Sequence, residues 1–510
     1  MPAQPLNVLH LIADQHHAGL MGCAGHRQAN TPHLDRLARE GVRFTAAYCQ
    51  NPICSPSRLS ILSGQYCSNH GYYGLCGPAP TQLPSVFGHF RAHGYRTAAI
   101  GKLHLPHAPR NWAAHDLDLF ADVYETIEGE MGRSEFFDGL ARDGLRELED
   151  SWFMPDGHGG IYIPWDARPS RLPYERNVES WCVDQANTFI DTCRASHEPF
   201  FMQVAFARPH HTIAPDQRFW NLYPEDLDLP PTIDQDPSHR PPHFQAAWKE
   251  FRETHWHFGP PFDFRSGARR QWRGTLACIS QVDDAVGRII AHLDVSGQLE
   301  NTIIIYGSDH GCYHGIHGIV EKAPGICSDA VCRVPFVWRV PGVASRVSDA
   351  LVENIDIAPT VSALCGLPAM ETVCGQDLSA LLSGRVESVR EMAVTENVWS
   401  KAVRWGRWRF VHYQPEMFPG QDIGELYDLE GDSDETCNLY ADPAHQDTVH
   451  TLRRLLCEWL IRVQRPATVL PRMPVQPMLG RRNYTIAGDG REPRSLGANA
   501  RHAARKLNYL

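Results

Sequence analysis

The stretch Asn7-Val8-Leu9-His10-Leu11-Ile12-Ala13-Asp14-Gln15 begins as a short, nearly continuous apolar run and ends abruptly in polar residues. Such a run is typical of a strand that is buried on both faces of a parallel sheet. Three later apolar runs also end in polar residues: 96–100 before Lys102 and His104, 200–206 before His210, and 302–306 before Asp309 and His310. Because ligands bind at the carboxyl ends of parallel strands, we expect these polar residues to meet at one edge of one sheet.

Segments with helical patterns alternate with these strands, at 31–41, 85–94, 178–193 and 276–293. This alternation predicts an α/β fold, with a large, mostly parallel sheet sandwiched by helices over residues 1–385. Within it, residues 107–175 are interpreted as a long insertion that walls or covers a site. The Pro-rich stretch 208–265 is interpreted as mainly loop.

A smaller C-terminal α+β domain is predicted over residues 386–465. Strands at 402–405 and 407–411 flank a tight turn and indicate an antiparallel sheet, with a further strand at 425–429 and a helix at 445–463. The tail, 466–510, has no core of its own. Packing on the main domain and packing on another subunit, as in a homo-oligomer, both stay open for it.

The composition is ordinary for a globular protein, with 43% hydrophobic and 21% charged residues among 510. The net charge of −11 argues against a nucleic-acid-binding face. No apolar run reaches membrane-spanning length, and the N-terminal residues lead directly into the first strand without a recognisable signal peptide. The fifteen cysteines are scattered and lack the paired short spacing of a zinc module. Without a secretion signal, we expect reduced thiols and a cytoplasmic protein.

The segment Cys54-Ser55-Pro56-Ser57-Arg58 carries the candidate nucleophile. Pro56 fits the first turn of a helix, where its missing N–H costs nothing. Cys54 would then lie at a helix N-terminus, where free backbone N–H groups favour an anion. We therefore expect an unmodified thiol at this position to have a lowered pKa and to be a competent nucleophile.

The strand-end residues also predict a metal site. Asp14, Gln15, Asp309 and His310 offer mainly oxygen ligands and one imidazole, which favours Ca²⁺, Mg²⁺ or Mn²⁺ over a structural zinc. Positive charge around a tetrahedral oxyanion would come from Arg58, Lys102 and Lys322. A metal, cations and a nucleophile at a helix start together suit the transfer of a sulfuryl or phosphoryl group.

The whole set of motifs resembles the sulfatase family of the alkaline-phosphatase superfamily, over nearly the entire chain. The matching segments, in family order, are Asp14-Gln15, Thr31-Pro32-His33-Leu34-Asp35, Cys54-x-Pro-x-Arg58 with Gly64, Gly101-Lys102-x-His104, Pro209-His210, Asp309-His310-Gly311, Lys322 and Glu425-Leu426-Tyr427-Asp428-Leu429. The resemblance implies that a modifying enzyme oxidises Cys54 to formylglycine. It also implies one divalent metal, Ca²⁺ or Mn²⁺, on Asp14, Gln15, residue 54, Asp309 and His310.

The resemblance further implies a role for each catalytic residue. Formylglycine would be hydrated to a diol, and one hydroxyl, deprotonated with help from Asp309, would attack the sulfur of a small-molecule sulfate ester. Arg58 and Lys102 would hold the diol and the sulfate. His210 and Lys322 would stabilise or protonate the leaving oxygen, and His104 would take the proton of the second hydroxyl.

Some residues depart from the common family pattern. Asp14-Gln15, Asp309-His310 and the run 168–173 resemble the branch of choline sulfatases and phosphonate monoester hydrolases, whereas Lys102 with His104 favours sulfate esters. Two alternatives therefore stay open, namely a phosphonate monoester or phosphodiester hydrolase and an inactive sulfatase-like binding protein. An acidic residue common in relatives is replaced by Cys312, and the role of His317 is open.

Two groups of residues have weaker interpretations. An aromatic cluster in the insertion would line an aryl-accepting pocket or simply pack as core or lid: Trp112, Trp152, Tyr162 and Trp165. Four histidines near the motifs are interpreted as bystanders: His16, His17, His211 and His314.

Overall fold

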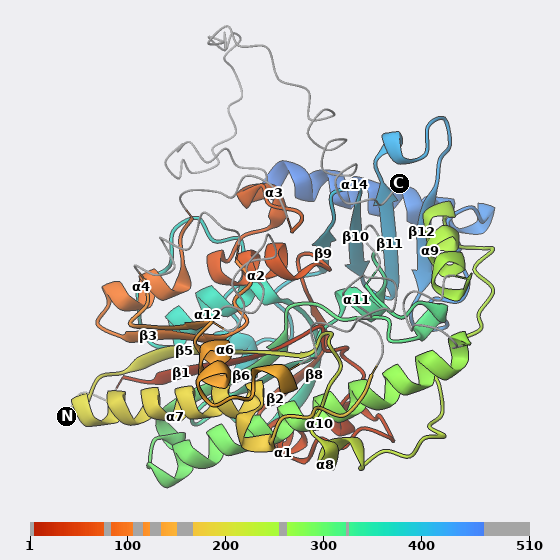
Figure 1. The fold of residues 1–510 in the computed structure, drawn as a ribbon. Coiled ribbons are helices and arrows are strands. Elements are labelled where there is room, and N and C mark those ends of the chain that lie inside the picture. The colour runs from red at the N-terminus through yellow and green to blue at the C-terminus, as the bar shows by residue number, and fades with distance from the viewer. Residues whose placement is uncertain are drawn as a thin grey trace, which may run out of the picture.

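An eight-stranded sheet forms the centre of the molecule in the computed structural model, which describes residues 5–75, 83–105, 116–122, 134–149, 167–253, 263–322 and 326–463 (Figure 1). The strand order is β4-β3-β5-β1-β6-β7-β2-β8. The strands are β1 (Asn7–Asp14), β2 (Val42–Tyr48), β3 (Arg96–Gly101), β4 (Leu119–Asp122), β5 (Phe200–Pro209), β6 (Thr302–Ser308), β7 (Phe336–Arg339) and β8 (Arg346–Glu353). Only β7 runs antiparallel to its neighbours, so the prediction of a mostly parallel sheet is confirmed.

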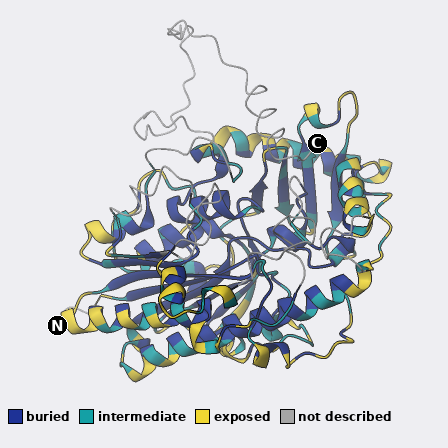
Figure 2. Ribbon diagram, in the orientation of Figure 1, coloured by how far each residue is buried: buried dark blue, intermediate teal, exposed yellow. Residues whose placement is uncertain are grey.

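The central strand β1 is buried along its whole length, because side chains of alternate residues enter two different cores. Leu9 and Leu11 belong to one core and Val8 and Ile12 to the other. The first core lies under α1 (Pro32–Glu40), α7 (Val178–Ser196) and α10 (Phe264–Val295). The second lies under α2 (Cys54–Ser63), α4 (Val86–Ala92) and α12 (Ile357–Leu364). Figure 2 shows the resulting buried layer, with exposed residues mainly on the outer faces of the helices.

The helix α2 differs from the outer helices because all ten of its residues are buried. It begins at Cys54, with Pro56 in its first turn as predicted. It ends at Gly64, whose φ of 66° lets its N–H bond to the carbonyl of Ser60. A side chain at Gly64 would have to adopt this left-handed conformation and would press against Val373, which explains the glycine.

Two segments that were expected to be irregular also contain regular elements. The Pro-rich stretch 208–265 contains α8 (Gln217–Trp220) and α9 (Pro242–Glu253), and α10 begins at Phe264 rather than near residue 276. The proposed insertion 107–175 contributes β4 at the edge of the main sheet and α6 (Glu135–Arg142). Residues 106–115, 123–133 and 150–166, with the four aromatic residues named above, lie outside the described residues.

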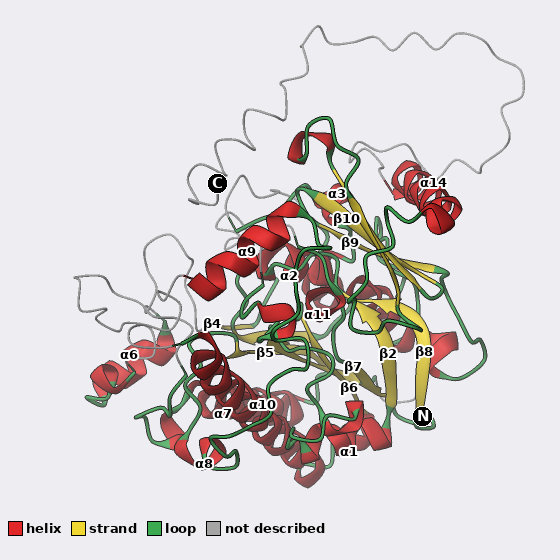
Figure 3. Cartoon of the chain, turned by 90° about the vertical axis from the view of Figure 1, so that its right-hand side faces the viewer, coloured by secondary structure: helices red, strands yellow, loops and turns green. Residues whose placement is uncertain are grey.

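A second sheet, of four antiparallel strands, confirms the predicted C-terminal unit (Figure 3). Its order is β12-β11-β10-β9, with β9 (Met392–Glu396), β10 (Ser400–Trp405), β11 (Trp408–Tyr413) and β12 (Gly424–Asp428). One face packs on α14 (Gln446–Val463), and the other packs on α9 and on α11 (Asp329–Cys332). Two further short helices are α3 (Cys67–His70) and α13 (Ser379–Leu382). The tail from residue 464 lies outside the described residues. No described helix combines the length and apolarity needed to cross a membrane.

Candidate active site

The polar residues predicted to meet at one sheet edge do meet there. Asp14 ends β1, Lys102 follows β3, His210 follows β5, and Asp309 and His310 follow β6. These strands are parallel neighbours, so their carboxyl ends lie at the same edge. The segment after β2 brings the start of α2, with Cys54, to the same place. At the end of β3, Gly101 has a φ of 89° and lies against the carbonyl of Ala205, where any larger residue would collide.

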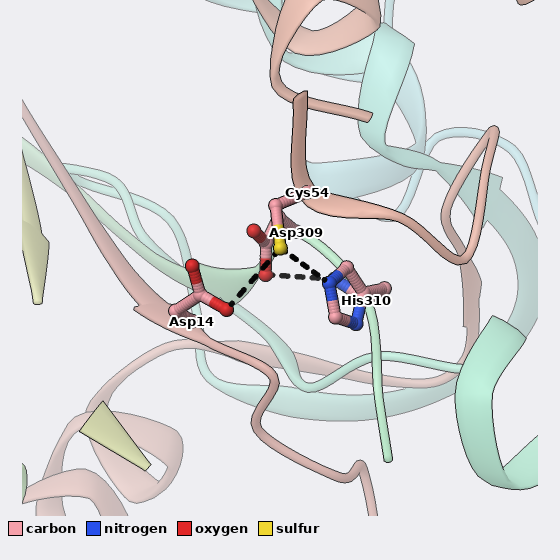
Figure 4. Close-up of side chains that lie close together, drawn as sticks. All are labelled: Asp14, Cys54, Asp309 and His310. Carbon is pink, nitrogen blue, oxygen red and sulfur yellow. Dashed lines mark hydrogen bonds between the residues drawn. The ribbon is translucent and has the colours of Figure 1, made fainter. Parts of the chain in front are cut away.

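Four side chains form a compact, buried donor cluster at this edge (Figure 4). Asp14, Cys54, Asp309 and His310 each offer one donor atom, and these atoms all lie within 4.8 Å of one another. The Sγ of Cys54 lies 3.1 Å from Nε2 of His310 and 3.7 Å from Oδ1 of Asp14. Nδ1 of His310 lies 2.7 Å from the carbonyl oxygen of Gly311 and therefore carries the proton. This leaves the lone pair of Nε2 directed at the cluster.

The donor set fits a divalent cation. Two carboxylates and a neutral imidazole are ligands that suit Ca²⁺ or Mn²⁺. Gln15 lies beside them, and its Oε1 accepts a hydrogen bond of 2.7 Å from Nζ of Lys322. Its Nε2 donates to Sγ of Cys312 at 3.0 Å. Since an ammonium group only donates, this contact fixes which end of the Gln15 amide faces Lys322.

Arg58 joins the two carboxylates. Its Nε donates to Oδ2 of Asp309 at 2.8 Å, and its Nη2 donates to Oδ2 of Asp14 at 2.9 Å. Nζ of Lys102 is also 2.7 Å from Oδ2 of Asp14. Burial by itself raises the pKa of Asp14, but the charges of Lys102 and Arg58 outweigh it and hold that pKa well below its ordinary value. Both carboxylates thus have a cationic partner within the protein.

Replacing Arg58 with alanine is expected to lower the free energy of unfolding by about 3–5 kcal/mol, because it leaves two buried carboxylates without this partner. Urea unfolding in the presence of a chelator measures the effect without a contribution from metal ions. The matched control is Arg36→Ala, which removes the exposed ion pair with Glu40 and should cost no more than about 1 kcal/mol. An equal, small loss in both variants would contradict the structural role of Arg58.

The prediction of a lowered thiol pKa at Cys54 is wrong. Cys54 lies at the start of α2 as predicted, but it is only 1% exposed. Burial and the nearby Asp14 carboxylate raise the pKa of its thiol to about 11, in spite of the positive charges of Lys322 and Lys102. Without a bound cation, the unmodified side chain is thus a protonated thiol at neutral pH and a poor nucleophile.

The remaining predicted catalytic residues lie near the donor cluster, where Lys322 contacts Cys54 and the charge of Asp14 acts on both His104 and His210. Nζ of Lys322 lies 3.5 Å from Sγ of Cys54. Burial, the adjacent imidazole of His211 and the charge of Lys102 lower the pKa of His210 well below its ordinary value. Nδ1 of His210 lies 2.7 Å from the carbonyl oxygen of His211, so Nε2 is the atom that exchanges a proton. His104 has a lowered pKa through burial and the charge of Lys102, and neither ring nitrogen has a hydrogen-bond partner among the described residues.

His317, whose role the sequence left open, lies in a structural contact away from the donor cluster. Its Nδ1 lies 2.5 Å from Oε1 of Gln235, and its Nε2 lies 3.2 Å from Nη2 of Arg240. Sequence reasoning also missed the Ser57 hydroxyl, which donates to the backbone carbonyl of Asp309 at 2.5 Å. Its only signal was its position one residue before Arg58 in the motif.

Comparison with known proteins agrees with this geometry. The family model described as "Sulfatase" matches residues 6–367, well over half of the chain. The chain belongs to the sulfatase family. A second model, described as "N-sulphoglucosamine sulphohydrolase, C-terminal", matches residues 315–461, which include the four-stranded sheet.

Individual sulfatases align over most of their length. An arylsulfatase from Clostridium perfringens is 27% identical over 483 residues, covering 89% of this chain and 94% of the relative. A choline-sulfatase from Rhizobium meliloti is 26% identical over 455 residues, covering 86% and 83%. The solved phosphonate monoester hydrolase from Silicibacter pomeroyi shares the fold, with a TM-score of 0.75, 24% identity and coverage of 90% and 95%. The chain is therefore a hydrolase of the sulfatase type, in the alkaline-phosphatase superfamily.

Proposed function

We propose that this sulfatase hydrolyses sulfate monoesters, with aryl sulfates as the preferred class, after oxidation of Cys54 to formylglycine. The observation that carries the proposal is the position of Cys54, whose Sγ lies within 3.7 Å of Asp14, His310 and Lys322. Asp14, Asp309 and His310, with Gln15 beside them, would hold one Ca²⁺ or Mn²⁺ ion. Once bound, this ion supplies positive charge next to the nucleophile and the sulfate oxygens.

Different side chains near residue 54 are assigned to binding and to proton transfer. Arg58 and Lys102 supply the positive charge that holds the sulfate oxygens and the residue-54 hydroxyls. Asp309 would accept the proton of the attacking hydroxyl, whose oxygen bonds to sulfur as the bond to the leaving oxygen breaks. His104 would then accept the proton of the second hydroxyl, so that the carbon–oxygen bond to the sulfate breaks, sulfate leaves and the aldehyde is restored. The modified side chain requires a formylglycine-generating enzyme as a partner during biosynthesis.

His210 and Lys322 serve the leaving oxygen. His210 is neutral in the free protein because burial and neighbouring cations lower its pKa. An anionic ester adds negative charge beside this ring and so favours its protonation. Nε2 of His210 would then donate the proton as the bond between sulfur and the leaving oxygen breaks, while Nζ of Lys322 stabilises the negative charge.

A phosphonate monoester hydrolase is the second candidate. The run 168–173, which suggests that branch, lies along the loop that follows His210: Arg168 N–H donates to Ile213 O at 3.1 Å, and Ser170 N–H donates to Pro215 O at 2.7 Å. The loop that carries the candidate proton donor therefore also bonds to the segment that resembles the phosphonate hydrolase branch. We nevertheless place sulfate esters first, because the pair Lys102 and His104 resembles the sulfate-ester enzymes of the family. Both residues lie in the site, since Nζ of Lys102 pairs with Asp14 and the charge of Lys102 acts on His104.

The chain is expected to hydrolyse 4-nitrophenyl sulfate with a kcat/KM at least about a thousandfold above that for 4-nitrophenyl phenylphosphonate. Steady-state release of 4-nitrophenol measures both reactions with the same product. Lys102→Ala should lower the rate on the sulfate ester, since it removes a cation from the sulfate-binding position. A preference for the phosphonate would make the second candidate the main activity.

A further inference from the structure

Two loops that carry predicted catalytic residues approach each other beside the site. The loop after β6 carries Glu321 and Lys322, and the loop after β5 carries His210 and His211. Oε1 of Glu321 accepts the backbone N–H of Lys322 at 2.9 Å. Oε2 of the same carboxylate lies 3.7 Å from Nδ1 of His211. The side chains are mostly buried, with 13% of Glu321 and 18% of His211 exposed.

His211 in turn contacts His210. The two imidazole rings have centroids 3.8 Å apart and planes inclined by 33°. The carbonyl oxygen of His211 also lies 2.7 Å from Nδ1 of His210. A continuous series of contacts therefore runs from Lys322 through Glu321 and His211 to His210, and its two ends are the residues assigned to the leaving oxygen.

The charge of Glu321 calls for a physical explanation. With Asp14 and Asp309, it is a further carboxylate, half-buried, near a site that binds an anionic ester, and it therefore opposes binding of that ester. Burying a carboxylate is costly unless it is paired, and the cation paired with Glu321 is Lys322, whose Nζ lies 3.7 Å from Oε1. Oε2 accepts no hydrogen bond within the described part of the chain. A residue that serves binding alone would not be an acid here. The contacts favour a role in holding the two loops relative to each other.

We propose that Glu321 and His211 are positioning residues, which hold the side chains of Lys322 and His210 at the leaving oxygen of the ester. This inference rests on the proposed function, since it assigns the pair to the departure of the organic group. His211, which the sequence suggested to be a bystander, thereby acts through His210 without contacting the sulfur.

The proposal has a specific kinetic consequence. A phenolate that is already stable needs little protonation when it leaves, whereas a more basic phenolate depends on a well-placed proton donor. Loss of positioning should therefore slow esters of weakly acidic phenols more than esters of strongly acidic ones. A residue that only stabilises the fold would slow both to the same extent.

The test measures kcat and KM for a series of aryl sulfates, from 4-nitrophenyl sulfate to phenyl sulfate, in Glu321→Gln. This change keeps the shape of the side chain and removes its charge. We expect kcat to change by less than about threefold for 4-nitrophenyl sulfate and to fall by at least about tenfold for phenyl sulfate, with KM nearly unchanged. The matched control is Asp191→Asn, which removes a similar pair with His292, between α7 and α10, and should alter neither reaction.

A second variant, at the other residue of the pair, shows whether the result for Glu321→Gln reflects a folding defect. His211→Phe keeps an aromatic ring against His210 but has no Nδ1, so it should show the same dependence on the leaving group. In the double variant the losses should not add. Equal losses for all esters, or a change in KM alone, would overturn the positioning role. Failure of the unaltered protein to hydrolyse any sulfate ester would instead refute the proposed function.

Discussion

Replacing Cys54 with alanine is expected to lower kcat/KM for aryl sulfates by about five orders of magnitude or more, the scale of losing a covalent nucleophile. The hydroxyl of Ser57 in the same helix turn is engaged by the carbonyl of Asp309. Initial rates with 4-nitrophenyl sulfate measure the effect, in protein co-expressed with a formylglycine-generating enzyme.

The control for this prediction is Cys193→Ala, which removes a fully buried thiol from the core beneath α7 and should leave the rate unchanged. Mass spectrometry of the peptide that contains residue 54 provides the second measurement. In the active protein, this peptide should carry an aldehyde in place of the thiol. A Cys54→Ala variant within tenfold of the unaltered rate would exclude residue 54 as the nucleophile.

Removal of divalent cations is expected to reduce the hydrolysis rate by at least about a thousandfold, because the charge next to the nucleophile is lost. Adding Ca²⁺ or Mn²⁺ back should restore the rate, and the ion that does so at the lower concentration identifies the preferred metal. A cation that binds only the folded protein also stabilises it, by about 2.7 kcal/mol at about one hundred times its Kd. Thermal unfolding with and without each ion measures this second effect.

The variant Asp309→Asn tests whether the effect of the cations depends on binding at the donor cluster, and not on some general effect of the chelator. It keeps the size of the side chain but removes a negative charge from the donor cluster. Its melting temperature should no longer respond to Ca²⁺ or Mn²⁺. A response equal to that of the unaltered protein would place the cation somewhere other than at Asp309.

The main sheet, and the edge of it that carries the site, could be predicted because the sequence patterns that indicate them are local. In β1, β3, β5 and β6, a short apolar run is followed within a few residues by the functional residue, as in Ala13-Asp14 and Ile100-Gly101-Lys102. Parallel strands then place these residues together without further information. For the same reason the start of α2 could be predicted, since Pro56 fits only its first turn.

Other elements depend on contacts that the sequence does not reveal. β8 begins with exposed and half-buried residues in alternation, because it is an edge strand that is held mainly by pairing with β2. Polar residues in such a strand are typical of a loop as well. The helix α9 begins with Pro242, which suits a first helical position but was interpreted as part of a Pro-rich loop.

Electrostatic properties were the least predictable from sequence. A helix N-terminus lowers the pKa of a thiol, but at Cys54 burial and the Asp14 carboxylate have the larger effect. Neither is visible in the motif around Cys54, because Asp14 is forty residues away and burial depends on the complete fold. Glu321 was missed for a similar reason, since its partner His211 lies on a different loop.

The complete burial of α2 has a consequence for the order of events during synthesis of the protein. An enzyme that oxidises Cys54 must reach a side chain that is 1% exposed after folding. If residue 54 is converted as proposed, the conversion has to take place while this segment is still extended. Once the chain has folded, the modifying enzyme no longer reaches the side chain. Molecules that fold before oxidation would keep the thiol and stay inactive for their lifetime. The fraction of active molecules would then depend on the rate of oxidation relative to the rate of folding.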